Sequence, residues 1–410
     1  MSSPRVIDLE EFQTRSLGLD DLSPEQGERI WRLFPKQVAV EFPSPKTGGA
    51  WQLKNLGWAG YLPIDATLGL LLTPKVPIAN LFRMLEYAYD LKSLRFFDDA
   101  VLLSALEDAY GRLAEILAKR VLDRIRRGVY RAYEPRSART AFVRGRIDTA
   151  QAIRAPWRVG LPCMYEEHTP DVEDNRLVAW TLEQILRSGI CSPQALPVRR
   201  AHRILEAMSG DQRFSARNCV GRIYSRLNDD YLTLHALCRF FLEHTGPSHE
   251  LGDRRMLPFV VDMDTLFEQF VVAWLREHLP PHLTLRSQEG ISVSGEGSVR
   301  FRIDLSIQER ATKRVLAVLD TKYKLGNKVA SDDVAQVVTY AELKGTKTAL
   351  LVYPRAVGDP FRGWVGQISV GTITFPLGSD LEAAGTGFLQ EVIFSSNATQ
   401  GLQAGSTASQ

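Results

Sequence analysis

The 410-residue sequence is poor in cysteine and lacks the common metal-binding spacings of cysteine and histidine. Its four cysteines include no C-x-x-C pair, and its seven histidines include no H-E-x-x-H. His278 and His282 have helical spacing, but Pro280 and Pro281 lie between them and interrupt a helix. These absences argue against a structural zinc site and favour reduced thiols. The four thiols are Cys163, Cys191, Cys219 and Cys238.

The chain also lacks long apolar runs, a signal-peptide pattern and a strong charge imbalance. No apolar run approaches the roughly 20 residues that span a bilayer. The first residues are polar and charged, unlike the apolar core of a secretory signal. We therefore expect a soluble cytoplasmic protein with no membrane partner. The formal net charge of +2 gives no overall attraction to nucleic acid, so any DNA binding must come from local patches.

What is present is an ordinary globular composition, 44% hydrophobic and 24% charged, in a chain long enough for two or three domains. The pattern predicts a multidomain α+β fold. Residues 1–95 form a β-rich module, 96–245 a helical middle domain and 246–395 a third domain. The small and polar residues 396–410 are expected to be disordered.

Hydrophobic periodicity gives the elements of these parts. Helices are predicted over 22–34, 79–91, 98–128, 175–189, 196–210, 228–246, 264–279 and 331–345. Strands are predicted over 38–42, 51–55, 68–74, 283–288, 298–307, 313–323 and 346–354. Asp264 is the expected N-cap of its helix. From residue 264 onward the predicted order is helix, three strands, helix, strand.

Two aspartates in this third domain have the spacing of a paired site. In SVRFRIDLSI, apolar residues alternate with polar ones, and Asp304 lies on the polar face. The next strand, VLAVLDTKY, carries Asp320 at the end of an apolar run. A hairpin between the two strands can bring the carboxylates side by side, where they repel unless a cation intervenes. Mg²⁺ is a hard ion with oxygen ligands and supplies that cation.

Strand geometry sends Asp320 and Lys322 to one face and turns Thr321 away, which leaves the Thr321 carbonyl free as a further metal ligand. Lys322 can then orient a water molecule, ease its deprotonation or neutralise charge on a phosphate. Gln336 and Tyr340 are spaced i, i+4 and share one face of the following helix.

Glu268 lies among apolar residues of the preceding helix and has two interpretations. It is a candidate third carboxylate of the site. Alternatively, it is an exposed acid favoured near a helix N-terminus.

Asp304, Asp320-Thr321-Lys322 and Gln336-x-x-x-Tyr340, with Glu268 upstream, resemble the PD-(D/E)XK nuclease core of the RecB-like type, although Ile303 replaces the usual proline. The resemblance implies an αβββαβ restriction-endonuclease-like core. It implies Asp304, Asp320, Lys322, Glu268, Gln336 and Tyr340 as catalytic residues. It implies Asp304, Asp320, Thr321 and Glu268 as metal ligands.

Further segments resemble McrC-like subunits of McrBC modification-dependent restriction systems, over about residues 35–355. These segments are YLPI (61–64), LLLTPKVPIANLFRMLEYAY (70–89), LKSLRFFDDAVLLSALEDAYGRLAEIL (91–117), VRGRID (143–148) and LPCMYEEHTPDVEDNRLV (161–178). The resemblance implies a Mg²⁺-dependent DNA endonuclease subunit that pairs with an McrB-like AAA+ GTPase and cuts DNA carrying modified cytosine. Its N-terminal module would dock on the partner and stimulate GTP hydrolysis. Two alternatives are a docking subunit that regulates an AAA+ ring without cutting, and a RecB-like repair nuclease.

Three other patterns have structural and functional interpretations. The basic segment 118–146 either follows DNA phosphates, faces an acidic partner or is a solvated helix face with a basic loop. Asp171, Asp174 and Asn175 are expected to serve structure, with Asp174 as a helix N-cap. The aromatic pairs Phe96-Phe97 and Phe240-Phe241 are expected in the core.

Overall fold

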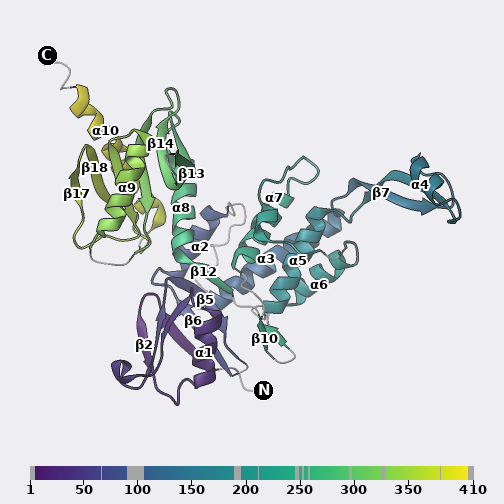
Figure 1. Cartoon of the computed structure of the whole chain (residues 1–410), viewed down its shortest axis with the longest axis horizontal. Helices are drawn as coiled ribbons and strands as arrows, with labels where there is room; N and C mark the ends of the chain where they lie inside the picture. The colour runs from purple at the N-terminus through teal and green to yellow at the C-terminus, as the bar shows by residue number, and fades with distance from the viewer. Residues whose placement is uncertain are drawn as a thin grey trace. The chain divides into compact units, whose positions relative to one another are not determined.

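The computed structural model of the chain forms two compact units, Met1–Ser104 with Val260–Gln410, and Ala105–Phe259 (Figure 1). The four-part division made from the sequence stays a prediction. The structure describes residues 5–65, 67–89, 106–188, 195–210, 212–244, 249–251, 254–256, 259–294, 298–324, 328–378 and 380–404.

The first unit begins with two small sheets around one apolar core. One sheet has the order β1-β6-β5-β12 and the other the order β2-β4-β3. Ile7, Leu53 and Leu70 are among the fully or nearly fully buried residues between them. The strands are β1 (Arg5–Glu10), β2 (Thr14–Leu17), β3 (Val38–Glu41), β4 (Trp51–Asn55), β5 (Trp58–Pro63), β6 (Leu68–Thr73) and β12 (Phe259–Asp262).

Two helices and a short 3₁₀ turn accompany these sheets. The helix α1 (Pro24–Leu33) begins at Ser23, whose hydroxyl accepts a hydrogen bond from the backbone N–H of Gln26 while the Gln26 side chain bonds back, as a capping box does. The turn η1 (Pro45–Thr47) precedes β4, and α2 (Ile78–Ala88) follows β6 and packs on α8 (Met263–His278).

The same unit contains a six-stranded sheet with the order β13-β14-β15-β16-β18-β17. Its strands are β13 (Leu283–Ser294), β14 (Ser298–Glu309), β15 (Val315–Thr321), β16 (Thr348–Tyr353), β17 (Arg362–Val365) and β18 (Ile368–Thr374). The first three strands are antiparallel, whereas β15, β16 and β18 are parallel. Helix α9 (Ser331–Lys344) crosses from β15 to β16 and packs on both, while α8 and α10 (Leu381–Ala404) also pack on the sheet.

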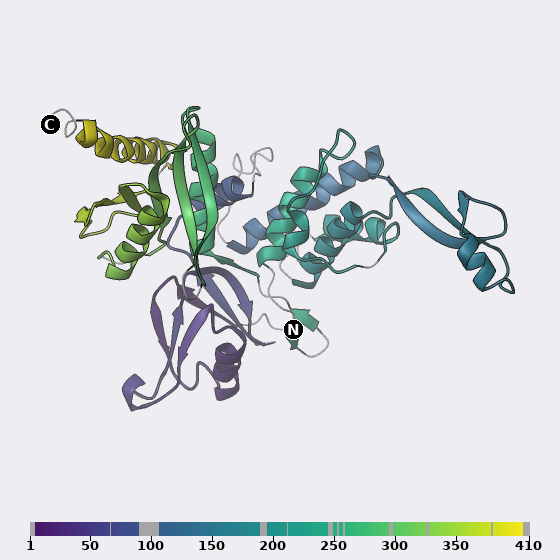
Figure 2. The ribbon, with the colours of Figure 1, turned by 45° about the horizontal axis from the view of Figure 1, so that its top comes forward.

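The second unit is a helical bundle with a β-structured arm. The bundle contains α3 (Leu106–Arg127), α5 (Glu173–Ser188), α6 (Ala195–Glu206), the 3₁₀ turn η4 (Ala216–Cys219) and α7 (Tyr231–His244). The arm contains β7 (Ala132–Thr140), β8 (Arg146–Ile147), α4 (Thr149–Arg154) and β9 (Leu161–Thr169), and it extends away from the bundle of its own unit (Figure 2). A small hairpin of β10 (His249–Leu251) and β11 (Arg254–Met256) completes this unit.

The mixed α and β character predicted from the sequence is confirmed, and three local predictions need correction. Asp262, not Asp264, caps α8 by accepting hydrogen bonds from the N–H groups of Asp264 and Thr265. The sheet of the arm lies in a region for which only helices were predicted. Helix α10 continues through Ala404, so residues 396–404 are helical where composition predicts disorder.

Leu381, Phe388 and Val392 in the first half of that last helix are buried. Within the described part of the chain, no helix is both long enough and apolar enough to cross a membrane.

Candidate active site

Asp304 and Asp320 lie side by side on neighbouring strands of the six-stranded sheet. The antiparallel register of β14 and β15 pairs Leu305 with Leu319, and one further step places Asp304 opposite Asp320. Asp304 is half-buried and Asp320 is 0% exposed. The backbone N–H of Thr321 donates a hydrogen bond to the Asp304 carboxylate. The hairpin thus brings together the two carboxylates that the sequence pairs.

Burial and mutual repulsion disfavour the ionised forms of the two carboxyl groups. Burial raises the pKa of Asp320, Lys322 acts in the opposite direction, and Asp304 raises it further. Burial, followed by the nearby charge of Glu268, raises the pKa of Asp304. A divalent cation would reverse both shifts because it stabilises the ionised carboxylates.

The hydrogen bonding of the Asp320 carboxylate oxygens indicates whether such an ion fits the site. Among the described groups, neither oxygen accepts a hydrogen bond of good geometry, although Oδ2 lies 2.8 Å from Lys322 Nζ. Buried carboxylate oxygens without donors match Mg²⁺, which binds through one or two carboxylates and keeps several waters. No three His, Cys, Asp or Glu side chains gather closely enough to hold a metal within the described ranges, so other ligands would be backbone or water oxygens.

Lys322 connects the aspartate pair to helix α9. Its Nζ lies 2.8 Å from Asp320 Oδ2 and donates a hydrogen bond of 3.0 Å to Gln336 Oε1. Gln336 Nε2 in turn donates to the Tyr340 hydroxyl at 2.7 Å. Burial works against the charged ammonium, but the bond to Asp320 leaves the pKa of Lys322 raised. The lysine is therefore held as a cation, and Gln336 and Tyr340 are brought to the site as their i, i+4 spacing predicts.

Glu268 of α8 is half-buried and close enough to the site to respond to its charges. Burial raises the pKa of Glu268, and among the nearby charges Arg302 lowers it while Asp320 raises it. Its Oε1 accepts a hydrogen bond from Gln288 Nε2 of β13. The structure thus favours the interpretation of Glu268 as a site residue over that of a solvated acid, while direct metal ligation by Glu268 stays a prediction.

A buried glutamate links this site to the N-terminal sheets of the same unit. The hydroxyl of Tyr323, the residue after Lys322, donates to Glu11 Oε2 at 3.2 Å, and the backbone N–H of Lys75 donates to the same oxygen at 3.1 Å. The backbone N–H of Tyr323 donates to Asp264 Oδ1 at 3.2 Å. Glu11 and Asp264 therefore hold Tyr323 in place, and with it the neighbouring Lys322.

Sequence reasoning missed Gln288 and Glu11 for different reasons. Apolar residues occur at odd positions on both sides of Gln288, so periodicity gives no sign of its unusual role. Glu11 follows a short strand and reads as an exposed acid, whereas it is 0% exposed. Its contacts with Lys75 and Tyr323, both distant in the sequence, account for its burial.

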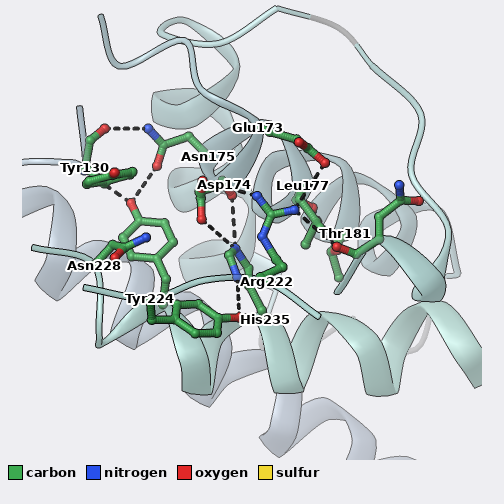
Figure 3. Close-up of polar contacts among 12 residues, drawn as sticks. Tyr130, Glu173, Asp174, Asn175, Leu177, Thr181, Arg222, Tyr224, Asn228 and His235 are labelled. Carbon is green, nitrogen blue, oxygen red and sulfur yellow. Dashed lines mark hydrogen bonds and ion pairs between the residues drawn. The ribbon is translucent and has the colours of Figure 1, made fainter. Parts of the chain in front are cut away.

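The acidic cluster of the second unit serves structure, as expected (Figure 3). Asn175 donates to the carbonyls of Tyr130 and Pro170, and Asp174 pairs with Arg222 at 3.2 Å. Helix α5 already begins at Glu173, so Asp174 lies in its first turn and the N-cap prediction is wrong.

A buried histidine belongs to the same network. His235 is 1% exposed, and its Nδ1 lies 3.0 Å from the Tyr224 hydroxyl. Burial, followed by the charge of Arg222, lowers the pKa of His235 to about 4, so the ring is neutral at physiological pH. A neutral, enclosed ring of this kind supports packing and offers no acid or base to solvent.

The remaining predictions have mixed outcomes. Phe240 and Phe241 lie in the core, while Phe96 and Phe97 lie outside the described residues. Cys163, Cys219 and Cys238 are buried free thiols, and Cys191 also lies outside the described residues. In the basic segment 118–146, several arginines have acidic partners, and its role stays open. The pairs are Arg124–Asp230, Arg126–Asp123, Arg136–Glu167, Arg136–Asp171 and Arg144–Glu167.

Comparison with known proteins relates the chain to one group of systems. A family model described as "McrBC 5-methylcytosine restriction system component" matches residues 53–354. An Escherichia coli (strain K12) protein described as "Type IV methyl-directed restriction enzyme EcoKMcrBC" is 24% identical over 340 residues, which cover 75% of this chain and 94% of that protein.

A solved structure resembles nearly the whole chain. It is titled "Refined half-complex from tetradecameric assembly of Thermococcus gammatolerans McrB AAA+ hexamers with bound McrC". The match has a TM-score of 0.55 and 17% identity and covers 95% of this chain and 100% of that one. At this identity the match shows a shared fold.

Proposed function

The chain belongs to the family of McrBC 5-methylcytosine restriction system components, and from that premise we propose that it is the DNA-cleaving subunit of such a system. The proposed reaction is Mg²⁺-dependent hydrolysis of a phosphodiester in DNA that carries modified cytosine. The observation that carries the proposal is the buried Asp304–Asp320 pair with Lys322 at 2.8 Å from Asp320.

The order of elements around this pair supports a PD-(D/E)XK core. From α8 the chain runs through β13, β14 and β15, then α9 and β16. Asp304 and Asp320 lie on the second and third of these strands, and Gln336 and Tyr340 lie on the helix that follows. A hairpin of neighbouring strands that presents two carboxylates and a lysine is what this type of nuclease core requires.

The residues divide the chemistry among them. Asp304 and Asp320 would hold Mg²⁺, which when bound polarises a phosphoryl oxygen and lowers the pKa of a coordinated water. Lys322 offers a fixed positive charge to the phosphate as negative charge develops in the transition state. Gln336 and Tyr340 hold the Lys322 ammonium in place. Contacts of these residues with the DNA backbone would carry no sequence information, so the choice of site falls to a partner.

We propose an AAA+ GTPase of the McrB type as that partner. The related solved structure contains McrB AAA+ hexamers with bound McrC, according to its title. In this chain the end of the arm exposes a cluster of apolar side chains, which we term the arm tip. It consists of Phe142, Val143, Ile153, Trp157 and Val159.

Val159 is 96% exposed and Trp157 is 77% exposed, which is unusual for large apolar side chains. Such a cluster marks a protein-contact surface. We propose that the arm tip takes part in docking to the GTPase, in addition to the N-terminal module. Stimulation of GTP hydrolysis by the N-terminal module is part of the same proposal.

The test is a cleavage assay with the full chain and its GTPase partner. Methylated DNA, Mg²⁺ and GTP are supplied, and the wild type is compared with Asp320→Ala. We expect only the wild type to cut, with GTP hydrolysis retained by the variant complex. Cutting by both proteins would contradict the catalytic assignment, and cutting by neither would favour a non-cleaving regulator of the ring.

A further inference from the structure

Gln288 has a backbone conformation that is rare for its residue type. Its φ is +56°, in the left-handed region, although it lies inside the long strand β13. Pairing with β14 is regular on both sides, with Ser287 opposite Leu305 and Glu289 opposite Ile303. That register puts Gln288 opposite Asp304. A non-glycine residue at positive φ is strained, and such strain persists where the surrounding structure enforces it.

The left-handed residue breaks the alternation of side chains along β13. Ser287 contacts α8, because its hydroxyl accepts a hydrogen bond of 2.6 Å from Arg276. Gln288 contacts α8 as well, through Glu268. Glu289 instead contacts the end of α9, where its Oε2 lies 2.6 Å from Lys344 Nζ. Two consecutive side chains therefore reach the same helix, which a regular strand does not allow.

Within the part of the chain that the structure describes, the Gln288 side chain makes its hydrogen bond to the candidate site. Nε2 donates to Glu268 Oε1, and the buried Oε1 of Gln288 has no hydrogen-bond partner among the described residues. Glu268 itself lies near the charges of Asp320, Lys322 and Asp304. The strained conformation thus has one visible result, the placement of an amide donor against the Glu268 carboxylate.

We infer that Gln288 is a positioning residue, which holds the Glu268 carboxylate beside the Asp304–Asp320 pair so that it can order the waters of a metal bound there. The inference rests on the proposed metal-dependent function. Groups that orient the surroundings of a metal typically alter its affinity by about 10- to 100-fold when removed. Gln288 acts through Glu268, so the effects of removing the two side chains should not add.

The test uses Gln288→Gly in the full chain. Glycine adopts positive φ without strain, so the variant keeps the backbone and loses the amide. We expect its melting temperature in metal-free buffer to equal or exceed that of the wild type. We expect its affinity for Mn²⁺, measured by electron paramagnetic resonance, to fall about tenfold. In a Glu268→Ala background, Gln288→Gly should cause no further loss of affinity.

Ser287→Gly is the matched control, because Ser287 also contacts α8 but does not touch Glu268. It should leave Mn²⁺ affinity unchanged. Wild-type affinity in Gln288→Gly would overturn the inference alone, as would independent, additive losses from Gln288→Gly and Glu268→Ala. If the wild-type chain bound no Mn²⁺, or bound it equally well after Asp320→Ala, the proposed function would be overturned, and the inference with it.

Discussion

At the scale of single residues, the central feature of the site is the buried charge of Asp320 and its pairing with Lys322. Asp320 is fully buried, and the nearby cation is Lys322, whose ammonium also bonds to Gln336. Removing one partner of a buried ion pair leaves an uncompensated charge, which destabilises a protein more than the pair stabilises it. The lysine therefore serves both the stability of the metal-free chain and, in our proposal, the chemistry.

Lys322→Met, compared with the loss of a neighbouring lysine charge, tests whether the charge is needed at this position. We expect a loss of DNA cleavage of at least about 100-fold, because no positive charge remains to stabilise the transition state. Hydrolysis of GTP by the partner should continue. Lys324→Met is the control, since Lys324 pairs with Asp333 at 2.8 Å and does not contact the aspartate pair. Equal cleavage by the two variants would contradict a specific role for Lys322.

Glu11 predicts a pH dependence of stability. Burial raises its pKa from 4.5 to about 7, although the hydrogen bonds from Lys75 and Tyr323 act in the opposite direction. The folded chain therefore binds more protons than the unfolded chain between these two pH values. Stability from this group falls as pH rises from about 4.5 to 7, and the whole penalty is present above pH 7.

Glu11→Gln should remove this penalty, because glutamine mimics the protonated acid. We expect the variant to be more stable than the wild type at pH 8, by on the order of 3 kcal/mol, and equal to it at pH 4. Denaturant unfolding at the two pH values measures the difference. The exposed neighbour Glu10→Gln should show no such change. A variant that is less stable at pH 8 would show that Glu11 is ionised and satisfied in the folded chain.

At the scale of elements, hydrophobic periodicity predicts the helices and strands that bury one face. The helix expected over 264–279 runs from Met263 to His278, and the strand expected over 298–307 runs from Ser298 to Glu309. The arm was missed because its strand β7 has no buried residue and thus no apolar alternation. A strand that is stabilised by pairing with a neighbour leaves little trace in its own sequence.

The sequence predicts those residues of the candidate site whose positions follow the repeat of a strand or a helix. Asp304, Asp320, Lys322, Gln336 and Tyr340 follow from strand alternation and helical spacing. The role of Gln288 could not be predicted, because it depends on a backbone conformation that breaks the alternation. The N-cap of α8 was misplaced by two residues, since Asp262 and Asp264 both suit that position and only the fold distinguishes them.

The polar network between α5 and α7 gives a prediction for the stability of the second unit. Asn175 is 1% exposed, and its Oδ1 accepts a hydrogen bond of 2.5 Å from the Tyr231 hydroxyl. Asn175→Ala removes this acceptor of the Tyr231 hydroxyl and the donor to the carbonyls of Tyr130 and Pro170, three hydrogen bonds in all, so we expect a loss of about 2–4 kcal/mol. Thermal unfolding followed by circular dichroism measures the loss. Asn218→Ala, at an exposed turn, should cost less than half as much.

At the scale of the whole molecule, the proposed cutting site and the arm tip belong to different units. The proposed cutting site lies in the six-stranded sheet of the first unit, whereas the arm tip belongs to the second unit. Changes at one should therefore leave the other intact.

Replacing both Trp157 and Val159 by serine should weaken binding to the GTPase at least about tenfold, because two exposed apolar anchors are lost. Their exposure means that the melting temperature of the free chain should not fall. Binding is measured by size-exclusion chromatography and calorimetry with the purified partner. Replacing the exposed Ile223 by serine is the control, since it lies outside the arm. Full binding by the double variant would exclude the arm tip from the docking surface.

The most direct measurement is the anomalous X-ray signal of Mn²⁺ in crystals of the chain. Mn²⁺ accepts the same oxygen ligands as Mg²⁺ and can be located by its scattering. The account predicts a peak between the carboxylates of Asp304 and Asp320, within bonding distance of both, that is absent from crystals of Asp320→Ala. A wild-type crystal in which Mn²⁺ binds elsewhere, while Lys322 alone neutralises Asp320, would contradict it.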